Sequence, residues 1–116
     1  MKNRRTIGNE WEKYSVFFLE TKGYNIVERN YYTNYGEIDL IAEYENIIIF
    51  VEVKFRSSKK FGTGAEAVNF KKQEKIRNSA LMYLDEKNIK DKDIRFDIVE
   101  INGPFDVSFN HIINAF

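Results

Sequence analysis

The sequence predicts an α/β domain, a mixed β-sheet flanked by helices, with its elements in the order α-β-β-β-α-β. Two segments repeat apolar residues at helical spacing, and several shorter ones are rich in β-branched and aromatic residues. The second helix separates the third and fourth strands, and a connection of that length permits parallel pairing. With 116 residues, the chain is long enough for one domain, 1–116, with a single core.

The first helix is predicted from Asn9 to about Lys22, after a basic arm at residues 1–7. Gly23 supplies the helix end. The apolar positions at helical spacing are Trp11, Tyr14 and Phe18, widened by Phe17 and Leu19. This aromatic stripe is expected to face the core.

Three strands follow the first helix. The first runs from Asn25 to Tyr32, and the turn Thr33–Gly36 leads into the second, Glu37–Tyr44. The third strand, Ile47–Phe55, is joined to the second by the polar pair Glu45–Asn46. These two strands are therefore expected to form a hairpin.

A two-residue loop at Glu45–Asn46 fixes the hairpin register, because Tyr44 then faces Ile47. The register places four charged residues in opposed pairs, Asp39 with Glu52 and Glu37 with Lys54. Opposed residues share a face of the sheet, as do residues two apart on one strand. Three acids and a lysine thus converge on one patch of an otherwise apolar hairpin.

Opposed carboxylates about 5 Å apart repel each other unless a positive charge lies between them. Mg²⁺ prefers such oxygen ligands and leaves coordination positions for water and a phosphate. The alternative is that Lys54 simply pairs with Glu37 and Glu52 across the strands. The flanking Ile, Leu, Val and Phe residues argue against an ordinary solvated face and favour a metal site.

The spacing of Asp39 and the unit Glu52-Val53-Lys54 at the end of an apolar strand resembles the core of the PD-(D/E)xK nuclease superfamily, although Ile38 replaces its proline. The matching pieces are 36–41 and 50–56. The whole chain resembles the small bacterial family known as YraN or UPF0102, described as predicted endonucleases distantly similar to archaeal Holliday junction resolvases. Further matching residues are Gly8-Asn9-Glu10, Phe61-Gly62, Lys72, Arg95-Phe96-Asp97 and 111–116.

The resemblance implies a minimal restriction-endonuclease-like fold and a Mg²⁺- or Mn²⁺-dependent endonuclease. Asp39 and Glu52 would hold the metal together with Glu10 of the first helix, for which Glu12 is the competing position. Lys54 would assist the nucleophile or the developing charge, with Glu37 as its neighbour in a supporting role. Lys72 and Gln73, on the helix after the third strand, are expected to reach the active site.

The charge is zero overall but unevenly distributed. The stretch from Lys54 to Arg77 has eight basic and two acidic residues, a balance of +6, and the remainder of the chain carries −6. Basic residues beside an acidic site suit a phosphate backbone, so Arg56, Lys59 and Lys60 are expected to hold DNA. The DNA could be branched, and a resolvase of symmetrical junctions would need two active sites and hence a homodimer.

The remaining chain is assigned to a loop over 57–64, a helix from Ala65 or Asn69 to Lys87, a strand over 94–101 and an extended segment within 104–116. His111, Arg95 and Asp97 are expected to be packing or structural residues. The sequence has no cysteine, no apolar run of membrane-spanning length and no signal-peptide core, which favours the cytoplasm and excludes a membrane partner.

Two other functions compete with the nuclease. One is a nucleic-acid-binding module on a nuclease scaffold whose catalysis is weak or lost, since a fold does not settle a function. The other is a metal enzyme that acts on a small phosphate ester, which would need a closed pocket. Metal-dependent cleavage that disappears in Asp39→Ala would separate the nuclease from the binding module.

Overall fold

The computed structural model describes residues 4–56 and 68–116, with side chains from residue 10 onward. It confirms the predicted α/β fold and adds a strand within the segment 104–116. The elements are α1 Arg4–Thr21, β1 Asn25–Thr33, β2 Gly36–Tyr44, β3 Ile47–Arg56, α2 Phe70–Glu86, β4 Asp93–Asn102 and β5 Ser108–Ile112.

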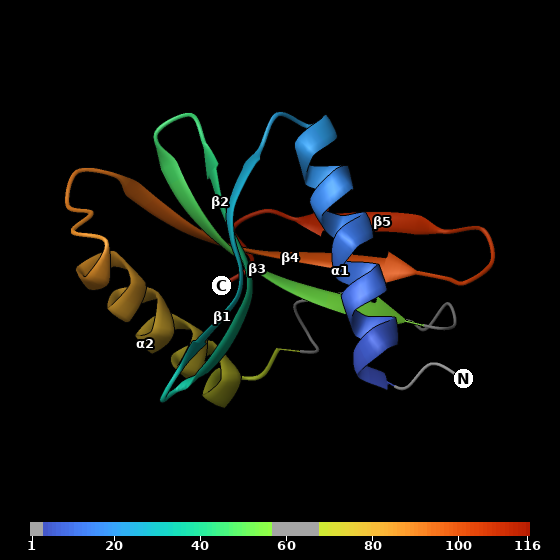
Figure 1. Ribbon diagram of the computed structural model, residues 1–116, viewed down its shortest axis with the longest axis horizontal. Helices are drawn as coiled ribbons and strands as arrows, with labels where there is room; N and C mark the ends of the chain where they lie inside the picture. The colour runs from blue at the N-terminus through green and yellow to red at the C-terminus, as the bar shows by residue number, and fades with distance from the viewer. Residues whose placement is uncertain (1–3, 57–67) are drawn as a thin grey trace.

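The described strands form one sheet in the order β1-β2-β3-β4-β5. Neighbouring strands are antiparallel except β3 and β4, which are parallel because α2 carries the chain back between them. In Figure 1, α1 crosses in front of β3, β4 and β5, whereas α2 lies at the other side of the view. Helix α1 contacts β1, β3 and β4, and α2 contacts β2 and β1. The sheet is therefore mixed, as predicted.

Two apolar clusters separate the sheet from the helices. On β3, Ile48 and Phe50 belong to the cluster that packs against α2, whereas Ile49 and Val51 belong to the cluster that packs against α1. Alternate residues of a strand point to opposite faces, so the two helices cover opposite faces of the sheet. By the same alternation Glu52 points toward the α2 face.

The helix starts differ from expectation in one case. Helix α1 begins at Arg4, so residues 4–7, predicted as part of a basic arm, are helical. Helix α2 begins after Asn69, whose side chain accepts a hydrogen bond from Lys72 N, as an N-cap residue does. This selects Asn69 over Ala65 as the start. The predicted loop at 57–64 lies outside the described residues. None of the described helices combines the length and apolar character needed to cross a membrane.

Candidate metal centre and catalytic cleft

The predicted register of the central hairpin is confirmed near its turn, but the two predicted charged pairs, Asp39 with Glu52 and Glu37 with Lys54, are not among the backbone pairs of β2 and β3. Tyr44 pairs with Ile47, and the ladder continues to Leu40 with Val51, its last backbone pair in the described chain. One step further, the Val53 N–H donates to the Asp39 carboxylate oxygen Oδ2 at 2.8 Å. The side chain thus takes the place of a backbone acceptor where the two strands separate, and this bond fixes the Asp39 carboxylate at the end of the ladder.

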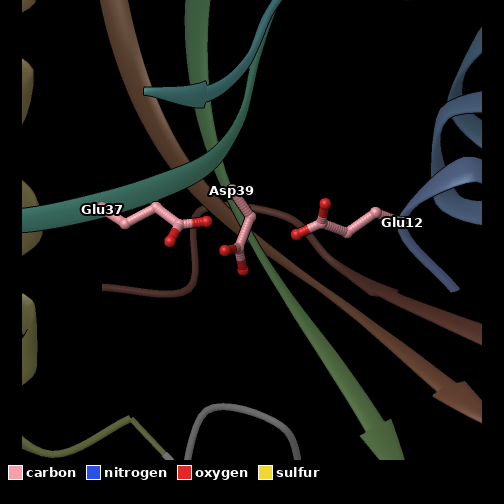
Figure 2. A group of neighbouring side chains, drawn as sticks. All are labelled: Glu12, Glu37 and Asp39. Atoms are coloured by element: carbon pink, nitrogen blue, oxygen red, sulfur yellow. The ribbon is translucent and has the colours of Figure 1, made fainter. Parts of the chain in front are cut away.

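Three carboxylates gather at this point. One oxygen from each of Glu12, Glu37 and Asp39 lies within 4.8 Å of the others. Figure 2 shows Asp39 between the other two side chains, with Glu12 reaching in from α1. All three residues are partly buried. Oxygen ligands so arranged fit a hard divalent cation such as Mg²⁺ or Mn²⁺.

Asn30 of β1 supports two members of this cluster. With its amide nitrogen turned toward the carboxylates, it donates to Glu37 Oε1 at 2.8 Å and to Glu12 Oε2 at 3.1 Å. Its backbone has a φ of 53°, in the left-handed region that asparagine tolerates better than most residues. Such a conformation inside a strand is unusual, and it places the amide beside the acids.

The cluster has too little positive charge around Asp39. Burial, followed by the charge of Glu52 and then those of Glu12 and Glu37, raises the pKa of Asp39 to about 8, against the lowering effect of the Val53 N–H. Burial also raises the pKa of Glu12, an effect that its hydrogen bond with Asn30 opposes. A cation bound at the cluster would favour the charged state of Asp39 and Glu12.

Glu52, only 6% exposed, lies next to two lysines. Its Oε1 is 2.6 Å from Lys72 Nζ and 3.6 Å from Lys54 Nζ. Burial lowers the pKa of Lys54, and the neighbouring Lys72 lowers it further. For Lys72, burial is outweighed by the hydrogen bond with Glu52 and by its charge, so the pKa of Lys72 is raised. Lys72 thus reaches the site, as predicted.

Glu37, Asp39, Glu52 and Lys72 border a cleft of about 430 Å³ between the sheet and α2, whereas Glu12 and Lys54 are not among its lining residues. Its lining residues are Tyr35, Gly36, Glu37, Asp39, Glu52, Asn69, Lys71, Lys72, Lys75 and Ile76. One side of the cleft is acidic and comes from β2 and β3. The other side is basic and comes from the first turns of α2.

The acid that α1 contributes to the cluster is Glu12 and not the predicted Glu10. The structure brings Glu12, the competing position, to Asp39, whereas Glu10 lines a second, apolar cavity of about 560 Å³ beside Trp11 and Phe109. Glu12 precedes the fully buried Ser15 and Leu19 by three and seven residues. Residues at that spacing share a helix face, so Glu12 lies on the buried side of α1. The sequence gives no clear signal for this, because Ser15 is polar and aromatic residues surround it.

Asn30 was also not predicted as a member of the site, although its position beside Asp39 can be derived from the sequence. Thr33 pairs with Gly36 across a two-residue turn, and Tyr31 pairs with Ile38. Counting one residue further along each strand places Asn30 beside Asp39. The signal was the turn length, from which the register of the first hairpin follows.

Other predicted substrate contacts have partners within the protein. Arg56 Nε donates to Glu100 Oε2 at 2.5 Å, and Gln73 Nε2 donates to the Val68 carbonyl at 2.9 Å next to the start of α2. Arg56 is thus bonded to the neighbouring strand β4, and Gln73 to the segment that precedes its own helix. Lys59 and Lys60 lie outside the described residues.

The structural expectation for Arg95, Asp97 and His111 agrees with the contacts. Arg95 donates to both oxygens of the fully buried Asp97, and His111 Nε2 lies 2.8 Å from Asp97 Oδ2. These contacts join β4 to β5 and to the residues that follow it. None of the three lines the cleft described above.

Comparison of the sequence with known proteins relates the chain to a family. Residues 11–101 match the model of "Uncharacterised protein family UPF0102". Similar proteins include UPF0102 proteins of Caldanaerobacter subterraneus subsp. tengcongensis, 47% identical over 98% of this chain and 97% of the relative, and of Clostridioides difficile, 46% identical over 98% and 99%. Another, from Fusobacterium nucleatum, is 48% identical over 87% of this chain and 85% of the relative.

Proposed function

We propose that this chain, which belongs to the UPF0102 family, is a metal-dependent endonuclease that hydrolyses phosphodiester bonds in DNA. The observation that carries the proposal is the cluster of Glu12, Glu37 and Asp39 beside the Glu52–lysine group. A purely structural cluster would be supplied with counter-charges, whereas Asp39 has only a backbone N–H as its donor among the hydrogen bonds described for it.

The donor set fits Mg²⁺ or Mn²⁺. Asp39 would hold the ion with Glu12 and Glu37, and Glu52 would join them on release from its lysines. When bound, such an ion lowers the pKa of a coordinated water and stabilises charge on a phosphate. The resemblance to PD-(D/E)xK nucleases supports Asp39 and Glu52 as ligands together with an acid of the first helix, here Glu12 in place of Glu10, and implies a supporting role for Glu37.

The two lysines have different tasks in this proposal. Lys54 has a lowered pKa, so it exchanges a proton more readily than an ordinary lysine and suits the orientation of the attacking water. Lys72 has a raised pKa and stays charged, which suits charge neutralisation on the phosphate. Glu52 contacts both ammonium groups and holds them beside the acidic cluster.

The experiment measures Mg²⁺ and Mn²⁺ binding by calorimetry alongside cleavage of labelled linear, flapped and four-way DNA. Asp39→Ala is expected to lose metal binding and cleavage together. Lys54→Ala is expected to retain metal binding and lose cleavage. The control is Glu20→Ala, which removes an exposed acid of α1 and should match the wild type. Full cleavage by Lys54→Ala would refute its role.

The second candidate is a binding module with weak or no catalysis. It is favoured by one observation, the 2.6 Å ion pair in which Lys72 already neutralises Glu52. DNA binding without cleavage of any substrate, in Mg²⁺ and in Mn²⁺, would make it the better description. If four-way DNA is cut symmetrically, a homodimer is expected, and light scattering during size-exclusion chromatography would reveal it.

A further inference from the structure

The basic side of the cleft has two lysines that are not committed to an internal partner. Lys71 and Lys75 line the cleft and are exposed, and within the described chain neither takes part in an ion pair. They are four residues apart on α2 and therefore lie on one face of the helix, with about 6 Å between their Cβ atoms. Lysines so placed can each contact one of two successive phosphates.

An aromatic ring lies in the same cleft. Tyr35, in the turn between β1 and β2, is 48% exposed and lines the cleft. No ring of the described residues stacks on it, in contrast to Tyr24, which stacks on Tyr44. A half-exposed ring beside unpaired lysines is the combination by which proteins bind unpaired bases and their phosphates.

The position of Tyr35 is fixed by hydrogen bonds. Its backbone N–H donates to Thr33 Oγ1 at 3.0 Å, and that hydroxyl is 2.6 Å from Ser79 Oγ of α2. The turn is thereby tied to the helix that supplies the lysines, and Figure 1 shows the two side by side. The turn that carries Tyr35 is consequently held beside the helix that carries the lysines.

We propose that the cleft binds a single-stranded stretch of nucleic acid, with one base stacked on Tyr35 and the adjoining phosphates on Lys71 and Lys75. The proposal rests on the proposed function and names its substrate class: DNA, or RNA of the same chemistry, that is unpaired where it is cut. In a duplex both faces of each base are covered, so stacking on Tyr35 would first require unstacking, which costs a few kcal/mol. A cleft of about 430 Å³ also has the size of a site for one small ligand.

The test measures binding in the Asp39→Asn background, in EDTA. That substitution removes a proposed metal ligand and prevents the proposed cleavage, so binding is read separately from catalysis. The probes are a single-stranded DNA that contains 2-aminopurine, whose fluorescence falls on stacking, the matching duplex, and single-stranded RNA of the same sequence.

The single strand is expected to bind at least about 10-fold more tightly than the duplex. Tyr35→Ala should weaken that binding about 10-fold and abolish the fluorescence change. Tyr35→Phe retains the ring and should bind as the background does. The matched control is Tyr32→Ala, which removes a 64% exposed tyrosine that does not line the cleft. Replacing Lys71 and Lys75 by alanine should reduce the salt dependence of log Kd by about 1.4.

Duplex binding as tight as single-strand binding, or equal losses in Tyr35→Ala and Tyr32→Ala, would overturn the inference. A preference between the DNA and RNA strands identifies which of the two the cleft takes, and either supports the stacking site. Strong, Tyr35-dependent binding by a wild type that cuts nothing would refute the endonuclease and leave the binding site intact.

Discussion

Two aspartates of the sheet have opposite surroundings. Asp97 on β4 is fully buried, yet it accepts hydrogen bonds from Arg95, from His111 and from the backbone N–H of Asn114. These donors outweigh its burial and lower its pKa. Asp39 on β2 is bordered instead by Glu12, Glu37 and Glu52, and its pKa rises to about 8.

The difference separates a carboxylate that stabilises the fold from one that the fold tolerates. Around Asp97 the chain supplies an arginine, a histidine and a backbone N–H, so the buried charge is compensated. Around Asp39 it supplies further acids, an arrangement that raises the free energy of the ionised state. Carboxylates kept together at such a cost are typical of functional sites.

The largest expected effect is at the compensated aspartate. Asp97→Ala leaves Arg95 and His111 without the partner that they share in a buried position. We expect the free energy of unfolding in urea to fall by about 3–5 kcal/mol. Metal affinity at 4 °C should be retained in whatever fraction stays folded. A loss below about 1 kcal/mol would mean that Asp97 does not stabilise the fold and would remove the contrast with Asp39.

The next effect is pH-dependent and concerns Asp39. Without metal, the folded protein keeps a proton on Asp39 up to about pH 8, whereas the unfolded chain releases it near pH 4. The folded state therefore binds more protons in this interval, and its stability falls as pH rises from about 4 to 8. Asp39→Asn removes this loss and can still accept the Val53 N–H.

Urea unfolding in EDTA at pH 5 and pH 8.5 measures this pH-dependent change in the free energy of unfolding. We expect Asp39→Asn to gain about 1–3 kcal/mol over the wild type between the two pH values, less than the full linkage value because the cluster can relax and admit water. Asp91→Asn, which neutralises an exposed acid, is the control. Parallel pH curves for wild type and Asp39→Asn would show that Asp39 is compensated after all.

The smallest effect sharpens the comparison on α1. Glu12→Gln should raise the Kd for Mn²⁺ about 10-fold, equivalent to about 1.4 kcal/mol, because it removes one carboxylate from the cluster. Glu10→Gln makes the same chemical change two residues earlier, at the second cavity, and should leave Kd unchanged. Calorimetric titration of both variants decides between them, and a weaker affinity in Glu10→Gln alone would restore the original assignment.

Much of the site was readable because it lies on one hairpin. The loop Glu45–Asn46 fixed the register of β2 and β3, and alternation along the strands then placed Asp39 and Glu52 near each other. The length of the intervening helix permitted parallel pairing of β3 with β4, and the structure has that pairing. The sequence is sufficient to predict which residues of two strands pair when a single turn fixes their register.

The rest depended on how elements dock. The stripe predicted to face the core includes Tyr14 and Phe17, which are 54% and 69% exposed, whereas Ser15 and Leu19 are buried. So many aromatic residues surround α1 that hydrophobic periodicity alone does not define its buried face. Two residues along a helix turn the side chain by about 200°, so assigning the buried face to the wrong side of α1 exchanges Glu10 for Glu12.

The location of the site between the sheet and both helices has a consequence for biosynthesis. Glu12 comes from α1, Asp39 and Glu52 from the central hairpin, and Lys72 from α2. A nascent chain that has emerged only as far as β3 lacks Lys72, and one whose α1 has not docked lacks Glu12 at the cluster. Under the proposed function, the capacity to cleave would therefore arise only late in folding, and nearby nucleic acids would be protected during translation from a partly made chain.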